Sequence, residues 1–311
     1  MARLTIALLA GGRSGEREVS LRSGEAVYLA LDPAKYNVTR YDPRDDLARL
    51  IREKKDIDLA FVLLHGKFGE DGRMQGFLDL LDIPFVGSGV LSSALSMNKK
   101  MAKGIYRRAG LTVAEDIVIT RGTAIGADEI IEKLGEFLVV KPVAEGSSLG
   151  ISLCRTKEAL QKGIGLAFQH DREVMVEQYI KGTEVTGCVL GTTSLTALPL
   201  VEIRPSAEYA FFDYEAKYIP GATEEICPAP LPKDHTERAQ SCAKAAHSAL
   251  MCDVWSRTDM ILKDEEIFIL ETNTIPGMTE NSLVPRAARA AGMSLSDFVD
   301  RLIQLSLEKT Q

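Results

Sequence analysis

The side chains best suited to chemistry lie on two strand-like segments near the C-terminus. Glu271 and Asn273 share one face of the predicted strand 267–273, because side chains alternate along a strand. A turn before this strand would place Asp259 opposite Glu271, with Arg257 on the same face as Asp259. Two carboxylates and an amide are hard oxygen ligands that suit Mg²⁺, which also keeps waters and phosphates in its shell. The spacing predicts a magnesium site, and a solvated hairpin with charges on its exposed face is the alternative.

A lysine followed by a glycine-rich loop is the second candidate. Lys141 ends the apolar run 137–141, and the segment 142–150 supplies glycines and serines before another strand-like segment begins. A cation beside a loop of backbone N–H donors can hold a phosphate. The loop is not a Walker A motif, because G-x-x-x-x-G-K-[ST] is absent and a strand, rather than a helix, follows it. A plain hairpin loop is the alternative.

Weaker candidates lie on other loops and strand ends. Glu177 and Glu184 flank the end of a predicted strand, where carboxylates could accept hydrogen bonds from an adenine amino group and ribose hydroxyls. Two surface glutamates would look the same. His65 lies on a glycine-rich loop after a buried strand, and the four histidines show no spacing typical of metal ligands. Asp213–Tyr218 lies in the long irregular stretch 206–232, and loops of this length are uncommon unless they are functional.

The elements that must position these residues change in type along the chain. Within residues 1–95, buried apolar runs at 4–9 and 57–64 alternate with helical periodicity at 16–31 and 74–81, which predicts a parallel, Rossmann-like sheet. Later strands joined by short turns predict antiparallel pairing. The other predicted elements are strands at 36–41, 84–86, 116–119, 137–141, 151–154, 173–178, 184–190, 195–203 and 254–262, helices at 91–110, 127–134, 157–168 and 235–251, and two C-terminal helices.

Composition narrows the class of protein. At about 150 residues per domain, the 311 residues predict two domains or three. The chain has 37 Lys and Arg against 44 Asp and Glu, and this net charge of −7 argues against a general nucleic-acid or anionic-membrane binder. It does not exclude a small polyanionic ligand, which needs only a few cations in one cleft.

Two further features bear on location. No apolar run reaches the roughly 18 residues that a membrane span needs, and the apolar start of the chain is better explained as a first strand than as a signal peptide. The five cysteines contain no C-x-x-C pair, which predicts free thiols in a reducing cytoplasm rather than disulfides or a zinc site.

Taken in order along the chain, these motifs resemble the D-alanine–D-alanine ligase family of the ATP-grasp superfamily. Each motif alone is weakly specific, but the ordered set spans nearly the whole chain. The segments that carry the resemblance are 11–20, 64–66, 69–72, 87–90, 96–99, 140–142, 145–148, 213–218, 257–259, 271–279 and 282–283.

The resemblance implies a fold of mixed α/β and α+β type. A Rossmann-like N-terminal domain at 1–97 would precede two ATP-grasp subdomains at 98–182 and 183–311, with a lid at about 206–226. The implied activity is the ATP-dependent ligation of two D-alanines through a D-alanyl phosphate, for peptidoglycan synthesis, in a cytoplasmic homodimer that binds neither nucleic acid nor membrane. The alternatives are an ATP-grasp ligase with D-serine or D-lactate as acceptor, and a non-catalytic nucleotide-binding protein.

The resemblance also implies roles for individual residues. Two Mg²⁺ or Mn²⁺ ions would be bound by Asp259, Glu271 and Asn273. ATP would be bound by Lys99, Lys141, Glu145, Ser147, Ser148, Glu177, Glu184 and Lys217.

The amino-acid substrates would lie beside a second set. The first D-alanine would be bound by Glu16 and His65, with Tyr218 of the lid linked to Glu16 through Ser147. A lid tyrosine accompanies dipeptide rather than ester formation in this family. Arg257 and the Gly277 N–H would stabilise the tetrahedral oxyanion, and Ser282 with the Leu283 backbone would bind the second carboxylate. The chain departs from the family pattern at Asn98 and Thr258, which flank functional positions.

Overall fold

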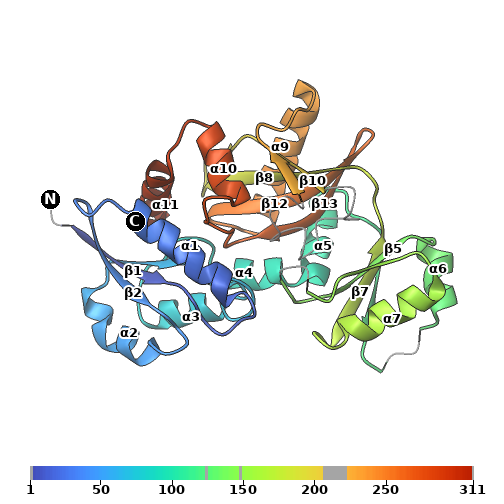
Figure 1. The fold of residues 1–311 in the computed structure, drawn as a ribbon, viewed down its shortest axis with the longest axis horizontal. Coiled ribbons are helices and arrows are strands. Elements are labelled where there is room, and N and C mark those ends of the chain that lie inside the picture. Colours follow the sequence, from blue (N-terminus) through green and yellow to red (C-terminus); the bar gives the residue numbers. More distant parts are fainter. Residues whose placement is uncertain (1–2, 123–124, 147–148, 206–222, 310–311) are drawn as a thin grey trace.

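The computed structural model describes residues 3–122, 125–146, 149–205 and 223–309 (Figure 1). Three sheets follow one another along the chain, and each lies within one of the ranges 1–97, 98–182 and 183–311. The division into three domains at these boundaries stays a prediction. We refer to the three parts as the N-terminal, central and C-terminal units.

The N-terminal unit is a parallel sheet, as predicted. β1 (Leu4–Leu9) lies between β2 (Tyr36–Tyr41) and β3 (Leu59–Val62). Continuous apolar runs form β1 and β3 because helices cover both faces of such a sheet. The predicted strand at 84–86 is reduced to one parallel bridge between Phe85 and Ala60. The other elements are α1 (Arg17–Ala30), α2 (Leu47–Glu53), η1 (Lys54–Asp56) and α3 (Arg73–Leu80).

Two helices lead out of this unit, where the sequence predicted one. The break falls at Asn98, whose side chain accepts a hydrogen bond from the Met101 N–H at 3.1 Å and so caps the second helix. The helices are α4 (Val90–Met97) and α5 (Lys99–Arg108).

The central unit is an antiparallel sheet with strand order β4-β7-β5-β6. Buried residues such as Val140, Val174 and Val176 face α6 and α7, and they form a hydrophobic core that belongs to this unit alone. The opposite face of the sheet carries charged residues. The elements are β4 (Asp116–Thr120), α6 (Ala127–Leu134), β5 (Leu138–Pro142), β6 (Ser152–Cys154), α7 (Lys157–Ala167) and β7 (Glu173–Gln178).

The C-terminal unit is a second antiparallel sheet, with order β11-β10-β8-β12-β13 and β9 paired to β8. The predicted strand 195–203 is divided in two around Pro199, which has no N–H to give to a ladder. The stretch 206–232, predicted to be irregular, contains the strand β11, which pairs with β10, and the lid at about 206–226 stays a prediction. The strands are β8 (Thr183–Gly191), β9 (Thr196–Ala197), β10 (Val201–Pro205), β11 (Thr223–Ile226), β12 (Val254–Lys263) and β13 (Glu266–Asn273).

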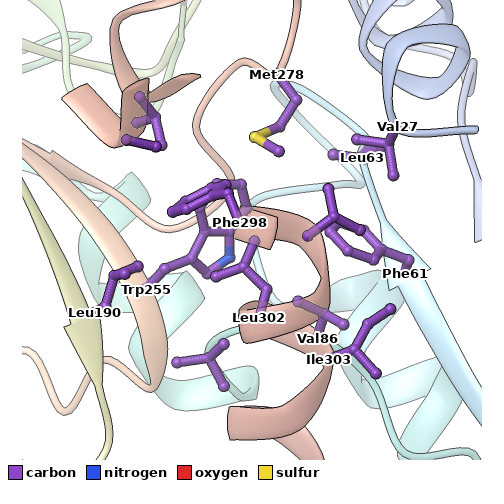
Figure 2. Packing of buried hydrophobic residues seen from close by; sticks show 14 of the residues in the cluster. Val27, Phe61, Leu63, Val86, Leu190, Trp255, Met278, Phe298, Leu302 and Ile303 are labelled. Atoms are coloured by element: carbon purple, nitrogen blue, oxygen red, sulfur yellow. The ribbon is translucent and has the colours of Figure 1, made fainter. Parts of the chain in front are cut away.

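Helix α9 (Lys233–Ala249) covers one face of this sheet, and α10 (Leu283–Ala290) and α11 (Leu295–Lys309) complete the unit. A large hydrophobic core joins it to the N-terminal sheet (Figure 2). In that core Trp255 and Phe298 form an edge-to-face pair with ring centroids 6.1 Å apart, and the same cluster contains Phe61 of β3 and Leu63 just after it. The first and third units are therefore packed together as one body.

Candidate active site

A buried charge cluster lies on the open face of the central sheet. Asp116 of β4 pairs with Glu177 of β7, and Lys141 of β5 lies diagonally across from Glu177 on the same face. One Glu177 oxygen accepts a hydrogen bond from Lys141, and the other accepts one from Lys103 of α5 at 2.7 Å. Burial disfavours the carboxylate, but the two ammonium groups outweigh burial and hold the pKa of Glu177 below its usual value. Glu177 is therefore a charged acceptor at neutral pH.

Lys99 connects this unit to the C-terminal sheet. It is the first residue of α5, and its Nζ donates to the Glu145 carbonyl at 2.6 Å and lies 3.5 Å from Glu271 Oε2. The departure at Asn98 has a simple explanation, because an asparagine oxygen caps the helix as an aspartate would. Lys99 is therefore held at the junction of the two sheets, where a phosphate could replace part of its present contacts.

The predicted hairpin register is confirmed. Asp259 pairs with Glu271 and Arg257 with Asn273, with an irregularity just beyond Asp259. Arg257 holds Asp259 with two hydrogen bonds, from Nε to Oδ1 at 3.0 Å and from Nη2 to Oδ2 at 2.8 Å, and Thr186 also donates to Oδ1. Burial opposes the guanidinium charge, but the carboxylates around it outweigh burial and raise the pKa of Arg257. Arg257 is a fixed cation.

The donor groups of the hairpin suit a divalent cation that is shared with a bound ligand. Within the described residues, no three Asp, Glu, His or Cys side chains are grouped as a metal site. The candidates are two carboxylates and an amide, and Asn273 Oδ1 already accepts the Ile275 N–H at 2.9 Å. Mg²⁺ is commonly bound by one or two carboxylates plus substrate phosphates and water, so this donor set fits it. A Ca²⁺-type cage of protein oxygens does not fit.

Glu16 lies where the N-terminal and central units meet. It precedes α1, and a Cβ added at Gly66 or at Gly146 would lie 2.6 Å or 2.9 Å from its Oε2. Both glycines therefore approach the carboxylate more closely than a larger residue allows. An ammonium group could bind Glu16 between these two loops.

His65 is buried beside the same loops. Its Nδ1 lies 3.1 Å from the Ile275 carbonyl, which can only accept, so Nδ1 carries the proton. Nε2 then accepts from the Ser23 hydroxyl at 3.1 Å, and Ser23 Oγ accepts the Met278 N–H at 3.2 Å. Both ring nitrogens are engaged, and they link the loop after β3 to α1 and to the segment after β13. A direct hydrogen bond from His65 to a substrate stays a prediction, and this geometry favours a positioning role.

Gly277 and Ser282 lie together before α10. A Cβ at Gly277 would lie 2.9 Å from Ser282 Oγ, which is 2.7 Å from Thr279 Oγ1. Ser282 is the N-cap residue of α10 and Leu283 is its first, buried residue. Unpaired N–H groups and the helix dipole favour a carboxylate at such a terminus.

Several predicted residues lie elsewhere. Glu184 is on β8, paired with Ile203 and Ile261, on the same face as Thr186. Thr258, the second departure, hydrogen bonds Thr272 at 3.0 Å within the sheet. Four predicted residues lie outside the described residues: Ser147, Ser148, Lys217 and Tyr218.

Sequence reasoning missed three buried or bridging residues. Lys103 follows Lys99 by four positions and so shares its helix face, which was the available signal. Glu70 accepts the Gly66 N–H at 2.9 Å and lies within the motif 69–72. Lys67 forms an ion pair with Glu145 and had no local signal.

Comparison with known proteins agrees with this geometry. Residues 105–304 match a family model described as the D-ala D-ala ligase C-terminus, and residues 42–88 match the corresponding N-terminus. The chain belongs to the D-alanine–D-alanine ligase family. The D-alanine–D-alanine ligase of Syntrophobacter fumaroxidans is 53% identical to it over 98% of both chains. That of Desulfotalea psychrophila is also 53% identical, over 99% of this chain and 97% of its own.

Solved structures of the family have the same fold. A Bacillus anthracis D-alanine–D-alanine ligase complexed with ATP has a TM-score of 0.87 at 37% identity over 98% of both chains. The VanG D-Ala:D-Ser ligase of Enterococcus faecalis has 0.85 at 34% identity, over 98% of this chain and 100% of its own. The predicted Rossmann-like and ATP-grasp fold is confirmed, as is the predicted ATP-dependent ligase class. Among the described residues, no helix is long and apolar enough to cross a membrane.

Proposed function

We propose that this chain joins two D-alanines to D-alanyl-D-alanine with the conversion of ATP to ADP and phosphate, supplying peptidoglycan precursors in the cytoplasm. The observation that carries the proposal is the position of Lys99, which links the loop after Lys141 to the carboxylate strand β13. ATP bound between the two sheets would meet cations from one side and carboxylates from the other.

The nucleotide would lie along the open face of the central sheet. Glu177 and Glu184 would accept hydrogen bonds from the base and ribose, and Lys141 and Lys99 would contact the phosphates. Glu145 belongs to the same loop. Ser147, Ser148 and Lys217 are proposed to contribute further donors. Asp259, Glu271 and Asn273 would hold two Mg²⁺ or Mn²⁺ ions, whose charge would offset that of the phosphate oxygens.

The reaction would take two steps. A carboxylate oxygen of the first D-alanine, whose ammonium binds Glu16, attacks the γ-phosphorus; the bond to the β-phosphate breaks and ADP leaves. The amine of the second D-alanine then attacks the acyl carbon and loses a proton, and phosphate leaves. Arg257 and the Gly277 N–H are placed to stabilise the oxyanion between these events. Ser282 and the Leu283 N–H would hold the second carboxylate.

The identity of the second substrate, the acceptor, needs evidence beyond the fold. The VanG relative is named a D-Ala:D-Ser ligase, so the fold alone does not fix the second substrate. The relatives at 53% identity are named D-alanine–D-alanine ligases, which favours D-alanine, as does the family's lid tyrosine at position 218. Tyr218 would close over the acyl phosphate and exclude water.

We also propose that the protein is a homodimer. Support comes from exposed hydrophobic side chains on the neighbouring helices α3 and α4, at Leu80, Val90 and Leu91. Exposed apolar side chains that lie together often mark a protein–protein contact, and a second copy of the chain would remove these from water. Sedimentation of the wild type against Leu91→Glu measures this, and a wild-type monomer would overturn it.

ADP release tests the reaction itself. The enzyme is supplied with ATP, Mg²⁺ and D-alanine alone, then with D-serine or D-lactate added, and the products are weighed by mass spectrometry. We expect D-alanyl-D-alanine in every mixture. ADP release without a dipeptide, or a product containing only D-serine or D-lactate as acceptor, would overturn the proposal.

A further inference from the structure

Lys103 is a buried cation with no part in the reaction described above. Its side chain is 2% exposed, and its Nζ lies 2.7 Å from Glu177 Oε2 and 3.1 Å from Asp116 Oδ1. The other oxygen of Glu177 accepts from Lys141. Lys103 therefore contacts Glu177 on the oxygen that Lys141 does not use, and Lys141 and Glu177 are the residues proposed to contact the nucleotide.

The position is an unusual one for a lysine. On either side of it in α5, Ala102 and Tyr106 pack into the hydrophobic core under the C-terminal sheet. An apolar residue could continue that core, whereas an ammonium must be paired to be buried. Its partners come from β4 and β7 of the central unit, so the cost of burial is offset only by these two carboxylates.

We propose that Lys103 is a positioning residue for nucleotide binding: it holds one oxygen of Glu177 so that the other oxygen orients the Lys141 ammonium toward ATP. The inference rests on the proposed contacts of Lys141 and Glu177 with the nucleotide. It assigns to Lys103 a role in ATP affinity without contact with ATP.

Hydrogen-bond counting explains how this would act. An ammonium has three N–H donors, and Lys141 gives one of them to Glu177. Because Lys103 takes the other oxygen, Glu177 cannot turn both oxygens onto Lys141. The group Lys141, Glu177 and Lys103 carries one net positive charge, which favours a phosphate or another acceptor. Without Lys103 that net charge is zero, and Glu177 is free to rotate.

The second partner of Lys103, Asp116, allows this role to be distinguished from a purely structural one. Asp116 also pairs with Arg107 near the surface, so it has a second cation. Replacing Asp116 would weaken the link between α5 and β4 but would leave Lys103 on Glu177. A structural network would respond to both replacements alike, whereas a positioning role predicts different responses.

The test compares Lys103→Met, Asp116→Asn and Lys100→Met with the wild type. Lys100 is the matched control, since its exposed ion pair with Glu173 joins the same helix to the same strand. Binding of a non-hydrolysable ATP analogue is measured by calorimetry, with KM for ATP, KM for D-alanine and the melting temperature. For Lys103→Met we expect analogue Kd and KM for ATP to rise by about tenfold or more, with KM for D-alanine within about twofold. Asp116→Asn and Lys100→Met should keep analogue affinity within about threefold.

A pH profile supplies a second readout. The charged groups facing Glu177 are Lys141 from β5, Lys103 from α5 and Asp116 from β4. In Lys103→Met, burial is opposed by Lys141 alone, so the pKa of Glu177 rises and the carboxyl gains a proton as the pH falls. The analogue Kd of this variant relative to that of the wild type should therefore increase as the pH falls from about 8 to 5, because protonation of the analogue's own phosphate affects both proteins alike.

Each outcome decides the proposal. Unchanged analogue affinity in Lys103→Met, or an equal loss in Asp116→Asn, overturns it. If Lys103→Met does not fold, Lys103→Gln takes its place with the same expected loss of analogue affinity, and unchanged affinity in that variant overturns the proposal. If the wild type binds no analogue, the proposed function fails, and that failure is seen before any variant is compared.

Discussion

The N-terminal unit meets the rest of the molecule in two chemically different ways. Toward the C-terminal unit it shares a hydrophobic core, in which Phe61 lies in the same cluster as Trp255 and Phe298 (Figure 2). Toward the central unit, the loop after β3 makes two polar contacts through Lys67. Its ammonium forms an ion pair with Glu145 and donates a hydrogen bond to the His170 carbonyl at 3.2 Å. One contact is apolar and continuous, and the other consists of separate polar links.

The central unit makes both kinds of contact with the C-terminal unit. Helix α5 packs into the hydrophobic core of the C-terminal sheet through Ala102 and Tyr106, whereas the central sheet itself has fewer links to that unit. Lys99 provides a polar link, and a small apolar cluster of Ala114, Ile180 and Phe268 lies where the chain crosses between them. Ion pairs at a surface are replaced by water at small cost, and units move relative to each other unless their interface is large and hydrophobic. We therefore expect the N- and C-terminal units to form a fixed frame, and the central sheet to open and close on the nucleotide.

Breaking the frame should give the largest effect. Phe298→Ala removes a fully buried ring from the shared core and should lower the free energy of unfolding by about 3–5 kcal/mol. Hydrogen exchange should show amides of β1 and β12 losing protection together, with β5 and β7 nearly unaffected. The matched variant is Leu160→Ala, in the separate core of the central unit, for which we expect the reverse pattern. Equal loss of protection in all three sheets after either substitution would show that the central unit is not independent.

Chemistry carried by the frame should be lost without loss of nucleotide binding. Arg257→Ala removes the proposed oxyanion donor on β12 and should reduce kcat by about 10²–10³-fold. Affinity for an ATP analogue should stay measurable, because the contacts of Lys141 and Glu177 are on the other unit. Steady-state kinetics and calorimetry check the two halves of the prediction. Turnover close to that of the wild type would remove Arg257 from its assigned role.

Local pattern was enough to predict the hairpin that carries the candidate residues Arg257, Asp259 and Glu271. Alternation and a short turn set Asp259 opposite Glu271, because both depend only on neighbours in the sequence. The strand β11 was missed because Glu224 and Glu225 have low strand propensity, and pairing with β10 compensates for this. Propensity is therefore overridden where a distant partner strand supplies the hydrogen bonds.

The polar contacts between distant parts of the chain could not be predicted from the sequence pattern. Lys103 and Glu177 are 74 positions apart, and nothing local to α5 indicates which distant sheet it covers. Lys67 reaches Glu145 across a similar gap. A charged residue on a loop looks the same in sequence whether it faces solvent or another unit. The candidate site motifs were identified through the family resemblance, but the polar contacts between the units could be identified only from the fold.

Weakening one polar link should affect substrate binding more than stability. Lys67→Met removes the ion pair with Glu145, and because Lys67 is partly exposed the free energy of unfolding should change by less than about 1 kcal/mol. KM for D-alanine should rise about two- to fivefold, since the loop carrying Gly66 would be less firmly held against the central unit. Denaturant unfolding and initial rates measure both. A stability loss as large as that of Phe298→Ala would contradict the contrast between the two interfaces.

The smallest effect should come from the closest approach across the polar interface. A Cβ at Gly146 would lie 2.9 Å from Glu16 Oε2, so Gly146→Ala displaces the carboxylate that would bind the first ammonium. Because only the end of a flexible side chain must move, we expect KM for D-alanine to rise about twofold to threefold with the stability nearly unchanged. Gly165→Ala in α7 of the same unit is the control: its added Cβ meets no atom within 4 Å, and a helix interior gains up to about 1 kcal/mol from this change. If both variants have the same KM, then Glu16 does not meet its substrate beside Gly146, and the central unit does not complete that part of the site.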